Sequence, residues 1–150
     1  MKILNLEIEI DASTEQVWNA IVTDALYREW AEEFQAGSYF EGGWNKGDAI
    51  KFLSLNEAGL KEGMVSEIAE SDYPRFISIR HFGTIMDGII DTTSEAVTAW
   101  LPSFENYTLE ALGDQKTRFI LEMESSEAYY DMFLEMWQRA MQKLKGISER

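Results

Sequence analysis

The most regular hydrophobic pattern in the chain lies in its last segment, residues 125–147. Apolar and aromatic side chains recur there at steps of three and four residues, with polar and charged residues between them. This period places the apolar side chains on one face of a helix. They are Tyr129, Phe133, Met136, Trp137, Ala140, Leu144 and Ile147. A helix with so bulky a face must be covered by a large apolar surface.

The first third of the chain contains one strand pattern and two short helix patterns. Apolar residues alternate with polar and acidic ones over residues 3–10, which predicts a half-buried strand. Ser13 and Gln16 have the spacing of a capping box, the usual start of a helix. The stripe that follows predicts a helix to about residue 22. A second helix begins at Thr23 or Asp24 and ends near Glu33.

Beyond residue 34 the apolar period shifts toward two, which is typical of strands. Short turns rich in Gly, Asn, Asp and Pro separate the runs, and such turns favour an antiparallel meander over parallel crossovers. The expected strands cover residues 37–41, 49–55, 60–70, 75–82, 104–112 and 117–124. This order of elements defines an α+β fold with helices packed on one face of an antiparallel sheet.

The segment 83–103 interrupts the meander. It is longer than an ordinary hairpin loop, and it contains a helical turn over residues 94–100 that Pro102 ends. Long connections of this kind are often functional or mobile. Two interpretations follow, a lid over a binding site and a plain surface insertion.

Several sequence motifs resemble one known superfamily. They are IEIDASTEQVWNAIV at 8–22, Trp30, WNKGD at 44–48, GMV at 63–65 and ENYTLEAL at 105–112. With them the chain resembles the START-like (SRPBCC) superfamily, and within it the group similar to the C-terminal domain of the activator of Hsp90 ATPase (AHSA1-like). The resemblance covers residues 1–150, which we interpret as a single domain. It implies a helix-grip fold, in which a curved sheet of about six to seven strands wraps around a long C-terminal helix and two short helices follow the first strand.

The helix-grip fold implies a cavity between the long helix and the concave sheet. The alternation of each strand then predicts which side chains face it. In the strand 75–82, for example, Ile79 and His81 face inward and Arg80 faces outward. The predicted cavity lining is Phe52, Met64, Ile79, His81, Tyr107, Leu109, Phe119, Tyr129, Phe133, Met136, Trp137 and Ala140.

The charge and cysteine content of the chain argue against several kinds of binding partner and chemistry. Thirteen basic and 27 acidic residues give the chain of 150 residues a net charge of −14. This charge opposes binding to nucleic acids and to anionic membrane surfaces. No cysteine is present, which excludes disulfides and thiolate chemistry. Without a signal-peptide or membrane-span pattern, we expect a cytoplasmic protein.

His81 is the single histidine. Facing a cavity, it would orient a polar ligand group or act as a general acid or base. The simpler interpretation is a histidine at the core or its rim that bonds to backbone or water. We expect no metal and no cofactor, because one histidine without cysteine is a poor zinc site.

Four acids lie in or beside the interruption, namely Asp87, Asp91, Glu95 and Glu105. Paired carboxylates there could perform acid–base chemistry or bind a hard cation. Their spacing fits no EF-hand, and we interpret them as solvated loop acids.

Three functions are compatible with these patterns. The first is binding of a small apolar or amphipathic molecule in the cavity. The second, implied by the resemblance, is a stress-related or chaperone-linked interaction with Hsp90 or through a homodimer, although the chain matches only the C-terminal domain of the activator. The third is a cyclase- or hydrolase-type enzyme that uses His81.

Overall fold

A computed structural model describes residues 1–150, which have an α+β fold. The helices are α1 (Thr14–Val22), α2 (Asp24–Ala31), α3 (Glu95–Thr98) and α4 (Tyr130–Ser148). The strands are β1 (Lys2–Ile10), β2 (Tyr39–Gly42), β3 (Ala49–Leu55), β4 (Lys61–Asp72), β5 (Phe76–Met86), β6 (Ile89–Asp91), β7 (Ser103–Gly113) and β8 (Lys116–Ser125).

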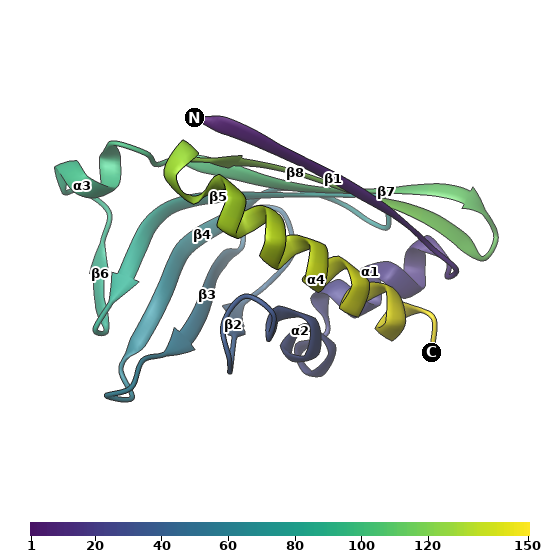
Figure 1. The fold of residues 1–150 in the computed structure, drawn as a ribbon, viewed down its shortest axis with the longest axis horizontal. Coiled ribbons are helices and arrows are strands. Elements are labelled where there is room, and N and C mark those ends of the chain that lie inside the picture. Colours follow the sequence, from purple (N-terminus) through teal and green to yellow (C-terminus); the bar gives the residue numbers. More distant parts are fainter.

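All strands belong to one antiparallel sheet. Its main order is β1-β8-β7-β5-β4-β3-β2, and the short β6 pairs with β5 beside this path. The first strand therefore pairs with the last, in a register that runs from Lys2 opposite Ser125 to Ile10 opposite Thr117. The sheet curves strongly, and α4 crosses its concave face (Figure 1). This arrangement confirms the predicted α+β class and the helix-grip architecture.

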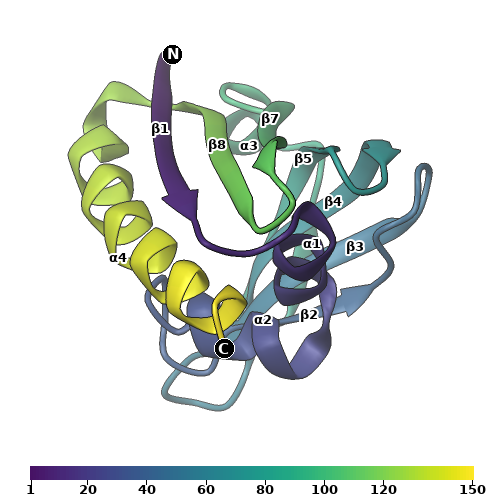
Figure 2. The same ribbon diagram turned by 90° about the vertical axis from the view of Figure 1, so that its right-hand side faces the viewer.

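The two short helices α1 and α2 cover only one end of the concave face. They lie beside the C-terminal half of α4, as Figure 2 shows from the side. The predicted capping box starts α1, since the Ser13 hydroxyl accepts from Gln16 N–H at 3.1 Å and Gln16 Oε1 accepts from Ser13 N–H at 2.8 Å. The core is concentrated under these helices, where Trp30, Ile21 and Leu144 are fully buried.

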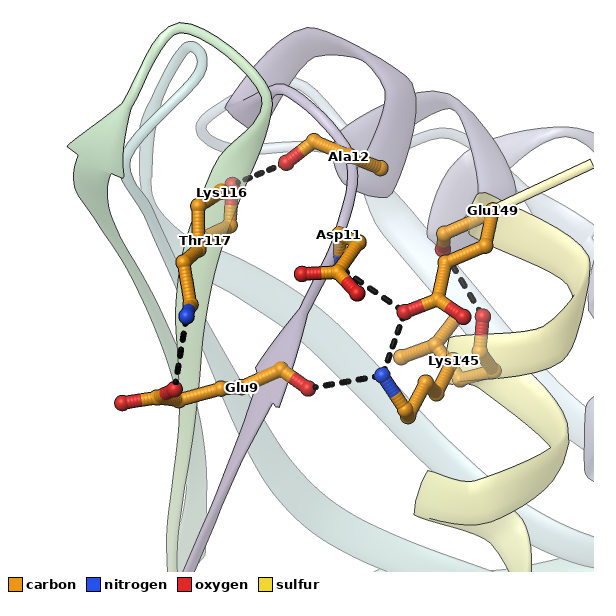
Figure 3. A network of polar contacts seen from close by, with 9 residues as sticks. Glu9, Asp11, Ala12, Lys116, Thr117, Lys145 and Glu149 are labelled. Atoms are coloured by element: carbon orange, nitrogen blue, oxygen red, sulfur yellow. Dashed lines mark hydrogen bonds and ion pairs between the residues drawn. The ribbon is translucent and has the colours of Figure 1, made fainter.

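A polar network attaches the C-terminal end of α4 to the loop that follows β1 (Figure 3). Lys145 Nζ donates to the Glu9 carbonyl at 3.2 Å, and Asp11 N–H donates to Glu149 Oε2 at 2.7 Å. Lys145 and Glu149 also form an ion pair. These contacts fix the end of α4 that lies over the core.

Two elements differ from the sequence-based prediction. The long helix begins at Tyr130 instead of residue 125, because Ser125 still pairs in the sheet with Lys2 and residues 127–129 form a single 3-10 turn. The interruption at 83–103 is also shorter than expected. Strand β5 continues to Met86 and turns back into β6.

Candidate functional site

A cavity of about 580 Å³ lies between the N-terminal half of α4 and the concave sheet. Side chains from β3, β4, β5, β7 and β8 form its walls, together with residues of α2 and α4. Of the 25 residues that border it, 15 are hydrophobic, so the wall is mainly apolar. The cavity exists because α1 and α2 cover the other half of the concave face and leave this half open.

Most of the predicted lining residues border this cavity. Strands contribute Phe52, Met64, His81 and Tyr107, and the last helix and its first turn contribute Tyr129, Phe133, Met136 and Trp137. Trp137 lies at the boundary with the core, where its ring is 5.7 Å from that of Tyr107 and 5.9 Å from that of Trp30.

The other four residues predicted to line the cavity lie elsewhere. Ile79, Leu109, Phe119 and Ala140 are buried in the core and do not border the cavity. They face the concave side as predicted, but they lie where α1, α2 and the C-terminal half of α4 fill the space. The alternation of a strand gives the direction of a side chain, whereas the packing of other elements decides whether space remains in front of it.

Exposed apolar side chains surround the opening of the cavity. They come from the start of β1, the end of the 83–103 interruption, the start of β7 and the first turns of the last helix. They are Met1, Trp100, Phe104, Tyr129 and Met132. A molecule that enters the cavity thus passes an apolar rim.

A chain of hydrogen bonds crosses three neighbouring strands at the cavity wall. His81 on β5 bonds through Nδ1 to the Ser66 hydroxyl on β4 at 2.6 Å, and through Nε2 to Glu105 Oε1 on β7 at 3.2 Å. The other oxygen of Glu105 accepts a short hydrogen bond from the Tyr107 hydroxyl. The side chains of His81 and Glu105 are only 12% and 15% exposed, so this polar cluster is held in a largely apolar wall.

The direction of these bonds follows from the protonation of Tyr107. Burial, followed by the nearby charge of Glu105, raises the pKa of Tyr107 well above its usual value. Tyr107 therefore stays a neutral phenol that donates to the carboxylate. In the arrangement that satisfies all four side chains, His81 donates from Nε2 to Glu105 and accepts a hydrogen bond from the Ser66 hydroxyl at Nδ1.

The site contains functional groups that the sequence analysis missed. Glu105 is not a solvated loop acid; it lies on β7, and its carboxylate borders the cavity between His81 and Tyr107. The alternation that turns Tyr107 and Leu109 inward applies equally to residue 105, so the signal was present. Tyr27 of α2 also borders the cavity, and the sequence analysis assigned it no role there.

Ser66 does not border the cavity and is only 1% exposed. Its hydroxyl lies behind His81 and holds the imidazole in place. The Ser66–His81–Glu105 arrangement therefore lacks the accessible nucleophile of a serine hydrolase. No group of three or more His, Asp or Glu side chains has a geometry that suits a metal ion. No helix combines the length and apolar character needed to cross a membrane.

Comparison with known proteins places this geometry in a fold class. No protein-family model matches the sequence, and no curated protein matches it. Among solved structures, protein MLL2253 from Mesorhizobium loti is 15% identical with a TM-score of 0.71, over 97% of this chain and 96% of that one. The Aha1 dimer from Colwellia psychrerythraea is 16% identical with a TM-score of 0.70, over 99% and 97%.

A third match, CalU16 from Micromonospora echinospora, is 18% identical with a TM-score of 0.65, over 97% of this chain and 75% of that one. The chain thus has the α+β helix-grip fold of these solved structures, which include an Aha1 protein. Identities of this size establish the fold alone.

Proposed function

We propose that the protein binds a small apolar or amphipathic molecule in the cavity under the N-terminal half of α4. The observation that carries this proposal is the cavity itself, with its volume of about 580 Å³, its mainly apolar wall and the hydrogen-bonded polar cluster of His81, Glu105 and Tyr107. Ligand sites typically have volumes of roughly 300–1,000 Å³ and combine apolar walls with a few convergent polar groups.

The size of the cavity supports an occupant. Protein interiors are close-packed, and an unfilled space of this size forgoes the contacts that the surrounding side chains would otherwise make. Water is a poor filler beside Phe52, Phe133 and Met136, because it needs several polar partners. An apolar ligand restores those contacts, and the polar cluster around Glu105 gives it one fixed orientation.

A neutral fluorescent dye tests the proposal. Nile red should become brighter when it enters the cavity of the wild-type protein. Met136→Trp fills part of the cavity and should abolish the increase, whereas Met86→Trp, on an exposed position of β5 outside the cavity, should preserve it. Wild-type protein that leaves the dye dark, or equal binding by both variants, would reject the proposal.

A second candidate is acid–base catalysis on a bound molecule, favoured by the His81–Glu105 contact of 3.2 Å at the cavity wall. Both imidazole nitrogens of His81 are already bonded, to Ser66 and to Glu105, so the group that would take a proton is the Glu105 carboxylate, positioned by His81. Because Ser66 is inaccessible, this carboxylate would activate water or abstract a proton from the ligand. Hydrolysis of p-nitrophenyl esters that Glu105→Gln abolishes and His81→Gln weakens, with Nile red binding retained, would support this candidate; turnover independent of Glu105 would exclude it.

Self-association and contact with Hsp90 stay predictions. The solved Aha1 of Colwellia is a dimer, and the exposed rim residues Trp100, Phe104 and Tyr129 offer an apolar surface for a second copy. Light scattering at micromolar concentration tests the dimer, since a monomeric mass throughout would reject it. A pull-down with purified Hsp90 tests the chaperone contact.

A further inference from the structure

We infer that the cavity selects an amphipathic molecule whose polar end is a protonated amine, held at Glu105. This inference rests on the proposed function, and it names the chemical class of the ligand. Three independent features of the cavity support it: the sign of the charges around it, the free acceptor capacity of Glu105 and an unpaired buried phenol.

The cavity is bordered by acids and by no lysine or arginine. Glu62, Glu105 and Glu124 contribute to its lining. The basic side chains of β4 and β5 pair with acids outside the cavity lining, Lys61 with Glu41 at 2.9 Å and Arg80 with Glu67 at 3.0 Å. The net charge of −14 of the whole chain also favours a cationic ligand over an anionic one. Apart from Met1, which carries the amino group of the chain at the rim, a ligand with a carboxylate or phosphate would meet only acidic side chains at this wall.

Glu105 has capacity for a further donor. Each of its oxygens accepts one hydrogen bond within the protein, Oε1 from His81 and Oε2 from Tyr107. A carboxylate offers about four acceptor positions, so lone pairs remain for a ligand. His81 and Tyr107 also fix the carboxylate in place, which lowers the cost of ordering it when a ligand binds.

Tyr27 supplies the third feature. The residue is only 5% exposed and borders the cavity, and its hydroxyl, which has no hydrogen bond to another protein group, is open to the cavity space. Burial and then the charge of Glu105 raise the pKa of Tyr27, so it stays a neutral phenol near that carboxylate. Buried polar groups normally have a partner. An ammonium group beside Glu105 would give the Tyr27 oxygen a donor.

The aromatic walls suit a cation as well. The rings of Tyr27 and Phe52 are 6.2 Å apart, and those of Phe52 and His81 are 5.7 Å apart, so several ring faces lie close to the polar cluster. Ring faces attract ammonium groups, and they do so more strongly away from water. A neutral alcohol of the same length would gain the apolar contacts without this attraction.

Three ligands with one tail and different heads test the inference. Decylamine, decanol and decanoate are titrated by calorimetry at pH 7.5, below their aggregation limits. We expect decylamine to bind at least about tenfold more tightly than decanol, and decanoate to bind least, because a hydrogen bond with a charged partner is roughly twice as strong as a neutral one. Met136→Trp should abolish binding of all three.

Two charge-matched variants identify the group responsible. Glu105→Gln should lower the affinity for decylamine about tenfold or more and leave that for decanol within about threefold. Glu122→Gln removes the same charge from the exposed outer face of β8, and it should change neither affinity by more than about twofold because solvent and salt screen that position. If Glu105→Gln does not fold, Tyr27→Phe replaces it, with a loss of about threefold expected for decylamine.

The failures of the two proposals are distinguishable. If none of the three ligands binds, the proposed function fails, and the inference fails with it. If decanoate binds as tightly as decylamine, or if Glu105→Gln leaves the preference between amine and alcohol unchanged, the inference is overturned while the binding function stands. With Tyr27→Phe, an unchanged affinity for decylamine overturns it.

Discussion

Replacing Glu105 by alanine tests the hydrogen-bond chain at the cavity wall. The change removes the acceptor of Tyr107, whose side chain is 2% exposed, and of His81, which is more accessible. An orphaned buried hydroxyl costs about 1–3 kcal/mol. Alanine also removes the desolvation penalty of the buried carboxylate, and this gain offsets part of the cost. We therefore expect Glu105→Ala to lower the free energy of unfolding by about 1–3 kcal/mol, or the Tm by about 3–10 °C for a chain of this length.

A double-mutant cycle isolates the contact itself. Tyr107→Phe removes the donor, and once it is absent Glu105→Ala should cost less. The expected coupling free energy between the two positions is about 1–2 kcal/mol. Urea denaturation, followed by tryptophan fluorescence and circular dichroism, measures each variant. Glu122→Ala, at an exposed position on β8, is the control and should stay within about 0.5 kcal/mol of wild type.

Additive effects would refute this reasoning. If the two single changes sum to the double change within about 0.3–0.5 kcal/mol, Glu105 and Tyr107 are not coupled. The carboxylate would then be a solvated acid, as the sequence alone suggested.

Three further predictions follow from the packing. Tyr27 and Tyr107 are held as phenols in the folded protein, whereas tyrosines in the unfolded chain ionise near pH ~10; the free energy of unfolding should therefore be constant through neutral pH and fall as the pH rises above about 10. An absorbance titration at about 295 nm should count two more ionised tyrosines in urea than in buffer, and equal counts would contradict the burial of these phenols. Ala140→Trp overfills the core and should cost about 1–3 kcal/mol or more, whereas Met136→Trp, one turn away at the cavity, should cost less than about 1 kcal/mol; equal Tm losses would mean that the space beside Met136 is already filled. Ser13→Ala breaks the capping box of α1 and should cost about 1 kcal/mol in urea denaturation, with no cost if the cap is frayed in solution.

The fold was largely predictable because local and global signals agree. The strand predicted over 49–55 is β3 with the same bounds, and the Ser13 capping box starts a helix as expected. The start of the last helix was not predictable from its period. Tyr129 continues the apolar stripe, but the pairing of Ser125 with Lys2 delays the helix, and only the folded sheet contains that information.

The hairpin of β5 and β6 was predictable and was missed. Asp87-Gly88 lies between apolar residues on both sides, which is a strong signal for a two-residue turn. In the structure both residues have positive φ, 51° for Asp87 and 76° for Gly88. The sequence analysis interpreted Asp87 as one of several solvated loop acids and predicted no turn at this position.

The sequence predicted which side chains face the concave side of the sheet, but not which of them border the cavity. Alternation indicated that His81 and Tyr107 face inward, and the same rule includes Glu105 once its charge is disregarded. The predicted meander implies that β5 lies between β4 and β7, but it does not give the register, and the register is what brings Ser66, His81 and Glu105 together. Nor does a helical stripe distinguish Met136 at the cavity from Ala140 in the core, because neighbouring helices make that difference.

The central claim is that a small molecule occupies the cavity, and the methionines report on it directly. In protein labelled with ¹³C at the methionine methyl groups, Met64, Met123 and Met136 border the cavity, whereas Met141 is buried in the core and Met86 is exposed elsewhere. Titration with decanol should shift the methyl resonances of the first three and leave those of Met86 and Met141 in place. No shift at saturating decanol, or shifts of equal size at Met86, would contradict the claim.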